Sequence, residues 1–176
     1  KIVASNKVWA ESILERCAKR TNKKEASEAA KLARRNLGAK LPKLRDANSK
    51  NRKDCILFLT EGDSAIAGFS DARNSDFHGG YPLRGKSLNV YGKKEKAVLE
   101  NKEYADIMAA TGLIIGEPVD RSKLRYGKVY IATDADEDGK NIAALLVQFF
   151  QKHWPELLDP ADPFLHIFFT PLLGAT

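Results

Sequence analysis

The sequence predicts an α/β fold: a mostly parallel, Rossmann-like sheet flanked by helices and preceded by an N-terminal helical arm. Residues 55–60 and 128–133 are short apolar runs without polar alternation, a pattern typical of parallel strands buried on both faces. Segments with apolar residues at helical spacing separate these runs. Alternating strands and helices favour one sheet with helices on both of its faces.

The first third of the chain predicts a helix and then a linker. Residues 23–38 are rich in Ala, Lys, Glu and Arg, which favour helix. Gly38 suits the position after the helix, and Pro42 opposes its continuation. The segment that follows is polar and basic. We therefore expect a helical connector over residues 1–50 and the main domain over residues 51–176.

The remaining elements follow in order. Residues 61–72 predict a glycine turn and a short helix, and residues 76–92, with five Gly or Pro, predict a shaped loop. Residues 94–112 predict one or two helices that end at a glycine, and apolar residues within 142–150 continue at helical spacing. Residues 164–173 predict a last strand.

The charge is unevenly distributed. Residues 1–54 carry 16 Lys and Arg against 6 Asp and Glu, whereas residues 55–176 carry 13 against 17, and the net charge is +6. A basic flank beside an acidic body suggests a polyanion held near a metal-binding site. A solvated helical arm is the simpler alternative, which charge alone does not exclude.

Composition also bears on the compartment. No apolar stretch approaches the roughly 20 residues that cross a bilayer, and the N-terminal residues do not resemble a signal peptide. Cys17 and Cys55 match no metal spacing and no disulfide framework. We expect an intracellular protein with no membrane partner.

Acidic residues follow both of the best strands. Glu61 comes directly after the first, and Asp134, Asp136 and Asp138 come directly after the second. The carboxyl ends of neighbouring parallel strands meet at one edge of a sheet, where ligands bind. Oxygen ligands without His or Cys favour Mg²⁺ over zinc or copper. The pattern predicts that these acids hold a divalent cation.

Two other interpretations compete for the aspartates. The first half of an EF-hand loop fits Asp134 to Gly139, but position twelve of that loop is Leu145, not an acid. Acids at a helix N-terminus also cap free N–H groups. A cap could explain Asp138 alone, but not the pair before it together with Glu61.

A cationic loop completes the predicted site. Arg84 and Lys86 lie in a segment interrupted by Pro82 and Gly85, where a glycine lets the backbone approach a phosphate. A generic basic loop is the alternative. Together with the metal acids, the loop suggests Mg²⁺ chemistry on a nucleic-acid phosphate. We assign no chemistry to the three histidines, which are His78, His153 and His166.

Three motifs in this order resemble the TOPRIM domain of type IIA DNA topoisomerases. They are "EGDSA", "PLRGKSLNV" and "RYGKVYIATDADEDG". The segments "RYGKVYIATD", "HWPELL" and "FFTPLL" look more like the eukaryotic and large-phage branch than gyrase B. The resemblance implies the TOPRIM fold and an ATP-hydrolysing enzyme that cleaves and rejoins double-stranded DNA to change its topology.

The resemblance also implies roles for single residues. Glu61 matches the family's glutamate, a metal ligand and proton shuttle for the 3′ oxygen. Asp134 and Asp136 match the Mg²⁺-binding pair, and Asp138 matches a third, accessory acid. The loop positions that contact DNA beside the break are matched by Lys86 and Asn89, with Arg84 in support. Where the family commonly has a serine–histidine pair, this chain has Lys140 and Asn141.

The family places other parts of the reaction outside this chain. The attacking tyrosine lies on a separate winged-helix domain or subunit, ATP is held by an ATPase module, and the parent enzyme is a dimer or heterotetramer. We expect this chain to be a fragment that does not cleave DNA alone. The alternatives are a TOPRIM domain of a primase or nuclease, and a non-catalytic DNA-binding module.

Overall fold

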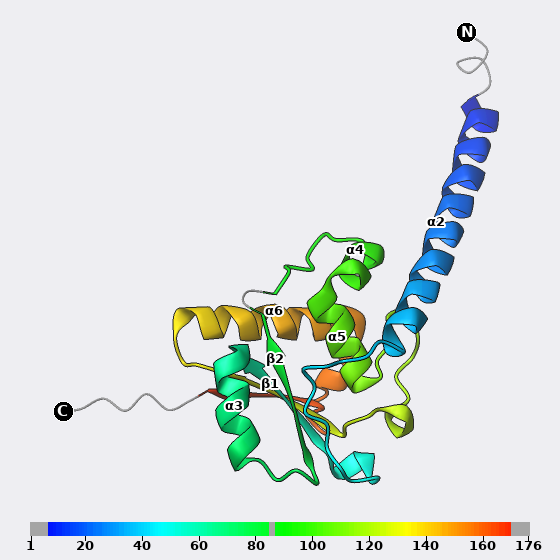
Figure 1. Ribbon diagram of the computed structural model, residues 1–176. Coiled ribbons are helices and arrows are strands. Elements are labelled where there is room, and N and C mark those ends of the chain that lie inside the picture. Colours follow the sequence, from blue (N-terminus) through cyan, green and yellow to red (C-terminus); the bar gives the residue numbers. More distant parts are fainter. Residues whose placement is uncertain (1–6, 85–86, 170–176) are drawn as a thin grey trace.

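The computed structural model describes residues 7–84 and 87–169 (Figure 1). Its helices and strands alternate after one long N-terminal helix. In chain order they are α2 Lys7–Leu37, η1 Arg52–Asp54, β1 Ile56–Glu61, α3 Gly62–Ala72, β2 His78–Leu83, α4 Glu95–Glu100, α5 Lys102–Thr111, η2 Arg121–Lys123, β3 Lys128–Thr133, α6 Glu137–His153, η3 Pro155–Leu158 and β4 Leu165–Phe169.

The four strands form one parallel sheet in the order β2-β1-β3-β4. The two apolar runs are its central strands, β1 and β3, and lie side by side. Leu57, Leu59, Val129 and Ile131 on these strands are fully buried. The predicted parallel α/β fold with an N-terminal helical arm is confirmed.

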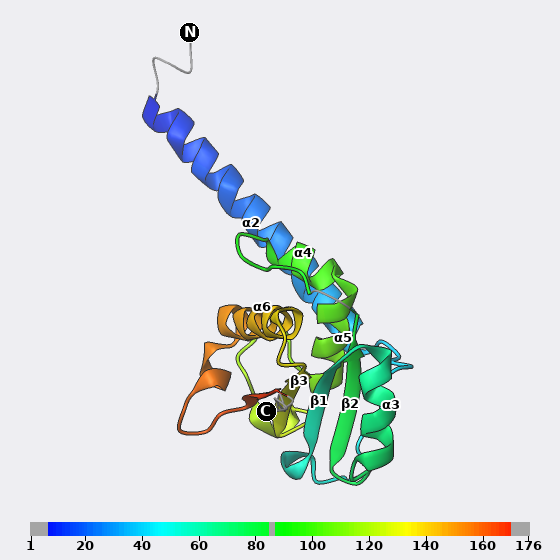
Figure 2. The same cartoon turned by 90° about the vertical axis from the view of Figure 1, so that its left-hand side faces the viewer.

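Helices cover both faces of the sheet (Figures 1 and 2). On one face, α3 packs on β1 and β2, and the rings of Phe69 and Phe58 lie 4.9 Å apart. On the other face lie α5 and α6, joined by stacked rings of Tyr104 and Phe149 at 4.1 Å. The site at the sheet edge is therefore held by a two-sided core.

The expectation of a loop over residues 76–92 is wrong for its first part, because His78–Leu83 forms strand β2. Its two glycines and one proline are typical of loops, so the local pattern did not predict a strand here. A Cβ atom on Gly79 would lie 2.2 Å from the Tyr126 hydroxyl, so packing explains the glycine. Pro82 is tolerated because β2 is the first strand in the sheet order.

The N-terminal helix joins the domain only through its C-terminal part. Ala29 and Ala33 are buried in the core, against α4 and α5. The first half of α2 projects away from the body, as both views show (Figures 1 and 2). Helix α2 ends at Leu37, directly before Gly38, as the sequence predicts.

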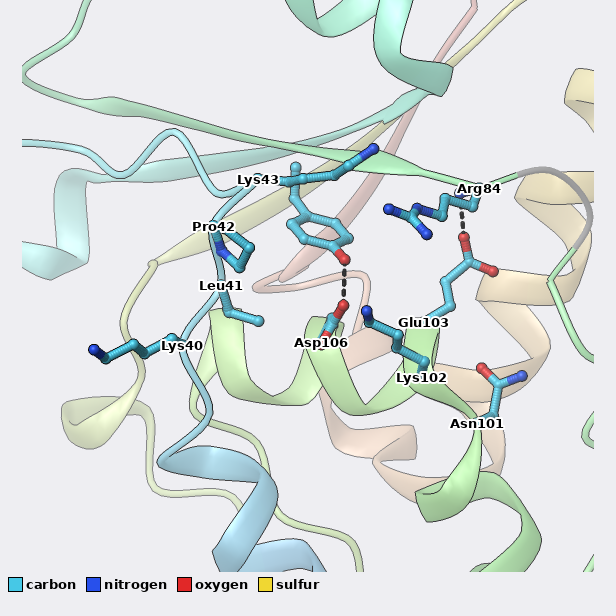
Figure 3. Close-up of a pocket in the computed structure, with 10 residues that line it drawn as sticks. Lys40, Leu41, Pro42, Lys43, Arg84, Asn101, Lys102, Glu103 and Asp106 are labelled. Carbon is cyan, nitrogen blue, oxygen red and sulfur yellow. Dashed lines mark hydrogen bonds between the residues drawn. The ribbon is translucent and has the colours of Figure 1, made fainter.

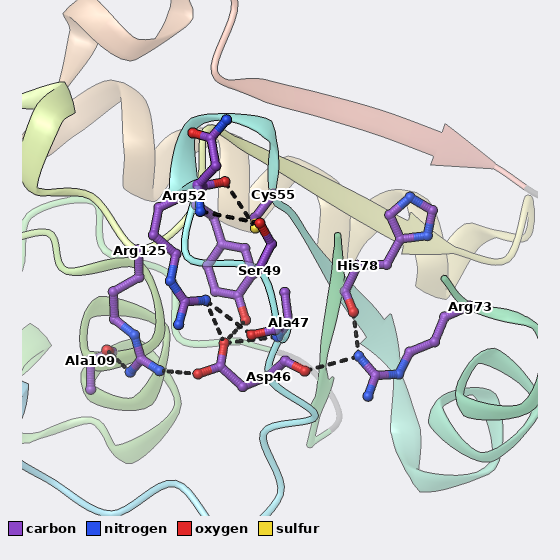
Figure 4. A network of polar contacts seen from close by, with 11 residues as sticks. Asp46, Ala47, Ser49, Arg52, Cys55, Arg73, His78, Ala109 and Arg125 are labelled. Carbon is purple, nitrogen blue, oxygen red and sulfur yellow. Dashed lines mark hydrogen bonds and ion pairs between the residues drawn. The ribbon is translucent and has the colours of Figure 1, made fainter. Parts of the chain in front are cut away.

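The polar connector after α2 is anchored to the body through Asp46 (Figure 4). The Asp46 carboxylate accepts hydrogen bonds from the Tyr126 hydroxyl at 2.5 Å and from the guanidinium of Arg125 at 2.7 Å. Arg52 donates a further hydrogen bond at 3.2 Å. Although burial raises the pKa of Asp46, the Tyr126 hydrogen bond and the two arginines outweigh it and lower that pKa.

Candidate active site at the carboxyl edge of the sheet

The carboxyl ends of β2, β1 and β3 bring the predicted residues to one edge. Glu61 ends β1 and pairs in register with Leu83, so Arg84 follows at the same edge. On the other side, Asp134 directly follows the last residue of β3. Gly62 turns the chain from β1 into α3 with a φ of +78°, a conformation that favours glycine.

The loop after β3 is folded tightly against the start of α6. Asp136 is the N-cap of α6, and its side chain accepts a hydrogen bond from the backbone N–H of Gly139 at 2.7 Å. A Cβ atom on Gly139 would lie 2.1 Å from the Asp134 carbonyl oxygen, so only glycine fits there. The helix cap is therefore Asp136, and the expectation that capping could explain Asp138 alone is wrong.

Glu61 lies in a strongly negative environment. Burial raises its pKa, and so do the charges of Asp136, Asp134 and Asp138, although a hydrogen bond from the backbone N–H of Asp134 opposes them. Its Oε2 atom is buried and has no hydrogen-bond partner among the described residues. The four predicted acids thus lie within electrostatic reach of one another.

A divalent cation fits this donor set chemically. Carboxylate oxygens are the ligands that Mg²⁺ prefers, and the unpartnered Oε2 of Glu61 leaves one buried acceptor available to it. Within residues 7–84 and 87–169, however, no three His, Cys, Asp or Glu side chains are arranged closely enough to hold a metal ion. The metal site stays a prediction.

A cationic pocket lies beside this edge (Figure 3). It has a volume of about 410 Å³ and is lined by residues of the connector, β2, the start of α5 and Arg84. Its four cationic side chains are those of Lys40, Lys43, Arg84 and Lys102.

The acids in this pocket already have partners. Glu103 accepts a hydrogen bond from the backbone N–H of Arg84 at 2.6 Å, and Asp106 accepts one from the Tyr81 hydroxyl at 2.5 Å. Lys43 forms an ion pair with Asp63 at 2.5 Å, which lowers the pKa of that carboxyl. The pocket lining carries four cationic side chains against two acidic ones, so its charge favours an anion from outside the chain.

The predicted DNA-contacting residues are only partly described. Arg84 and Asn89 are exposed, and the Asn89 side chain accepts a hydrogen bond from the backbone N–H of Tyr91 at 2.8 Å. Lys86 lies outside the described residues. The four acids and Arg84 therefore share one edge of the sheet, and the role of Lys86 stays a prediction.

Sequence analysis missed several residues at this edge. Lys40, Lys43 and Lys102 come from segments distant in sequence, so only the fold gathers them around Arg84. The buried hydroxyls of Thr60 and Thr133, which have no partner among the described residues, were also missed. A threonine that ends a strand carries no signal of its own, because threonine is common in strands.

Residues 56–172 match the family model described as "Toprim domain". The chain belongs to the Toprim domain family. Its sheet, with acids at the ends of β1 and β3, is therefore the Toprim fold, and the predicted family is confirmed. The described helices of this Toprim chain include none that is long and apolar enough to span a membrane.

The relatives of the Toprim chain are longer proteins. It is 44% identical over 147 residues to DNA topoisomerase 2 of Bombyx mori. This match covers 77% of this chain and 9% of that protein. It is 42% identical over 144 residues to the DNA gyrase B protein of Thermotoga maritima, covering 77% of this chain and 23% of that protein. The two branches are thus almost equally similar to it.

A solved structure agrees with these relatives. The crystal structure of the Plasmodium falciparum topoisomerase II DNA-binding, cleavage and re-ligation domain matches with a TM-score of 0.67 and 42% identity. The match covers 76% of this chain and 19% of that one. The Toprim chain therefore spans less than a quarter of each of these three relatives.

Proposed function

We propose that this chain is the Mg²⁺-binding Toprim part of an ATP-dependent type IIA DNA topoisomerase. Relatives named as DNA topoisomerase 2 and as DNA gyrase B support the enzyme class. The observation that carries the proposal is the buried, unpartnered Oε2 of Glu61 beside the aspartates that follow β3.

In this proposal Glu61, Asp134 and Asp136 hold the metal ion and Asp138 adds negative charge nearby. A bound Mg²⁺ would stabilise the charge that develops on the DNA phosphate during cleavage. Repulsion among the four carboxylates favours a spread arrangement of their side chains, which a cation would offset. Glu61 also takes and returns the proton of the 3′ oxygen, a role suited to a carboxyl whose pKa is raised.

The proposed partners follow from the same assignment. Double-stranded DNA lies along the edge, where Arg84, Lys86 and Asn89 contact its backbone. A tyrosine on a separate winged-helix domain or subunit attacks the phosphate, and the residues of the arm, 1–50, connect to the ATPase part. The exposed cations of the neighbouring pocket support a polyanionic partner.

The metal assignment is tested by direct binding. Titrating the chain with Mn²⁺, observed by electron paramagnetic resonance, should show one binding class that Mg²⁺ displaces. Asp136→Asn should weaken Mn²⁺ at least tenfold, whereas Asp71→Asn, on the exposed surface of α3, should not change it. Equal binding by both variants would remove Asp136 from the site.

The DNA assignment is tested by salt dependence. Each phosphate contact contributes about 0.9 to the slope of log affinity against log salt concentration. Arg84→Gln should reduce this slope by about one unit in the complete enzyme. Lys128→Gln, at the exposed opposite end of β3, provides the control. A slope unchanged by Arg84→Gln would exclude its contact with the DNA backbone.

A further inference from the structure

A second cavity, of about 300 Å³, lies between α3 and the sheet face that α3 covers. Thr60 of β1 pairs in register with Ala132 of β3, which pairs with Phe168 of β4. Paired residues on neighbouring strands point to the same face, so these three side chains form the floor. Ala65 and Phe69 of α3 form the opposite wall.

Three aromatic rings line the cavity. They belong to Phe58, Phe69 and Phe168, and Phe168 is 52% exposed. The volume falls at the lower end of the range of small-molecule sites, which are mostly apolar with a few placed polar groups. A single six-membered aromatic ring with one small substituent suits this space.

Three residues that line the cavity, Thr60, Glu61 and Thr133, each have a buried side-chain oxygen without a hydrogen-bond partner among the described residues. Thr133 points to the opposite face of the sheet from its neighbour Ala132, so Thr60 carries the hydroxyl on the floor. Thr60 is 3% exposed, and its hydroxyl oxygen has no hydrogen-bond partner among the described residues. Buried polar groups are nearly always hydrogen-bonded, because leaving one unpaired is costly. Thr60 is not among the proposed metal ligands, so its hydroxyl calls for a different partner.

The same cavity also has a charge. Glu61 and Asp134 line it, and both are acids of the carboxyl edge. Among the described residues that line it, none is basic. A ligand in this cavity therefore meets apolar walls, the buried hydroxyl of Thr60 and negative charge, a combination that favours an aromatic cation over an aromatic anion.

We propose that this cavity binds a small aromatic molecule that carries a positively charged N–H donor group. Its ring lies among the three phenylalanines, and its donor group hydrogen-bonds to the Thr60 hydroxyl oxygen. The positive charge lies toward Glu61. Such a ligand would occupy the site next to the acids, and the proposal does not depend on the topoisomerase assignment.

Benzamidine is a suitable probe, and benzoate is its counterpart of similar size and opposite charge. Titration of the full 176-residue chain without Mg²⁺ is followed by backbone amide shifts in NMR. Benzamidine should produce saturable shifts at Thr60, Ala132 and Phe168, and benzoate should bind at least tenfold more weakly. Equal affinity for both probes, or no saturable shift with either, would overturn the proposal.

Substitutions locate the ligand in the cavity. Ala65→Leu places a larger side chain in the wall and should weaken benzamidine at least tenfold. Ala67→Leu makes the same change at an exposed position of α3 outside the cavity and should leave affinity unchanged. Equal effects of the two variants would place the ligand elsewhere.

The hydroxyl is tested separately. Thr60→Val keeps the shape but removes the acceptor, and it should weaken benzamidine about threefold to tenfold, as expected for one hydrogen bond. Thr60→Ser keeps a hydroxyl and should restore the affinity. Full affinity of the valine variant would overturn the role of Thr60. Mn²⁺ binding by the same chain reports the metal site independently of this result.

Discussion

Asp46 and Glu61 are both partly buried carboxylates, and their surroundings are opposite. Asp46 accepts hydrogen bonds from Tyr126, Arg125 and Arg52, and the net effect of its environment lowers its pKa. Glu61 lies among three aspartates, and its Oε2 has no partner among the described residues. Burial and the neighbouring negative charges raise its pKa.

The difference separates a structural acid from a candidate functional one. The chain supplies every partner that Asp46 needs, so its charge stabilises the fold. The described part of the chain supplies no positive partner for Glu61, and an unbalanced charge lowers stability. Such an acid is typical of sites where a ligand supplies the opposite charge. Substitution should therefore change stability at Asp46 and chemistry at Glu61.

The largest expected effect is the loss of DNA cleavage in Glu61→Gln. The amide can neither carry a proton to the 3′ oxygen nor bind a cation as a carboxylate does. Mg²⁺-dependent cleavage by the complete enzyme should fall by about 10²–10⁴-fold, while ATP hydrolysis continues. The folded chain should be as stable as the parent or more so, measured by urea unfolding.

Glu100→Gln, on the exposed surface of α4, is the matched control and should leave cleavage unchanged. Normal cleavage by Glu61→Gln would favour a non-catalytic DNA-binding module. A large loss of stability in this variant would instead make Glu61 a structural acid like Asp46, and the comparison would fail.

The next effect is on stability. Asp46→Asn removes the charge that faces Arg125 and Arg52. Breaking a buried ion pair costs about 3–5 kcal/mol, and solvent around this partly exposed carboxylate reduces the loss to about 2 kcal/mol. Urea unfolding at pH 7 measures the change.

The pH dependence gives a second readout for Asp46. Its pKa is lowered from the ordinary 3.8, so its contribution is present above that pH and is lost as the pH falls through the lowered value. Wild type and Asp46→Asn should therefore converge in stability only in strong acid. A difference below about 0.5 kcal/mol at pH 7 would show that the network is dispensable.

Local pattern was enough for most of the fold. The buried strands β1 and β3 follow from uninterrupted apolar runs, and the ends of α2 and α5 follow from Gly38 and Gly112. Strand β2 was not predicted because its glycines are required by close contacts with Tyr126 and α3, which are distant in sequence. A pattern within one segment carries no information about such contacts.

The acids of the candidate site could be predicted because strand order brings two segment ends together. The register of β1 and β3 supports their common edge. The partners of Asp46 could not be predicted, since Tyr126 and Arg125 are separated from it by about 80 residues in the sequence. The cavity beside Glu61 likewise depends on three strands and one helix together.

A smaller change sharpens the comparison on the structural side. Tyr126→Phe removes one donor to Asp46 but keeps the buried ring and both arginines. Loss of a hydrogen bond to a charged group should lower the free energy of unfolding by about 1.5 kcal/mol. Combining it with Asp46→Asn should cost less than the sum of the single changes, because they share one interaction. Strict additivity in urea unfolding would argue against the bond.

The smallest effect concerns His153, a partly buried titratable group that, like Glu61, has an unpartnered side-chain atom among the described residues. Burial, followed by the charge of Lys152, lowers its pKa to about 4 from 6.5. Its Nε2 has no hydrogen-bond partner among the described residues, and the rings of Phe149 and Trp154 lie 5.5 and 5.7 Å away. The folded chain therefore holds fewer protons than the unfolded chain between these two pH values.

Stability should consequently fall as the pH drops from 6.5 toward 4. The loss over the first pH unit should be below about 1 kcal/mol, since solvent reaches part of the ring. In His153→Gln this part of the slope should disappear, measured by urea unfolding at a series of pH values. An identical slope in both proteins would mean that folding does not lower the pKa of His153. The comparison of His153 with Glu61 as groups whose charged form is disfavoured would then fail.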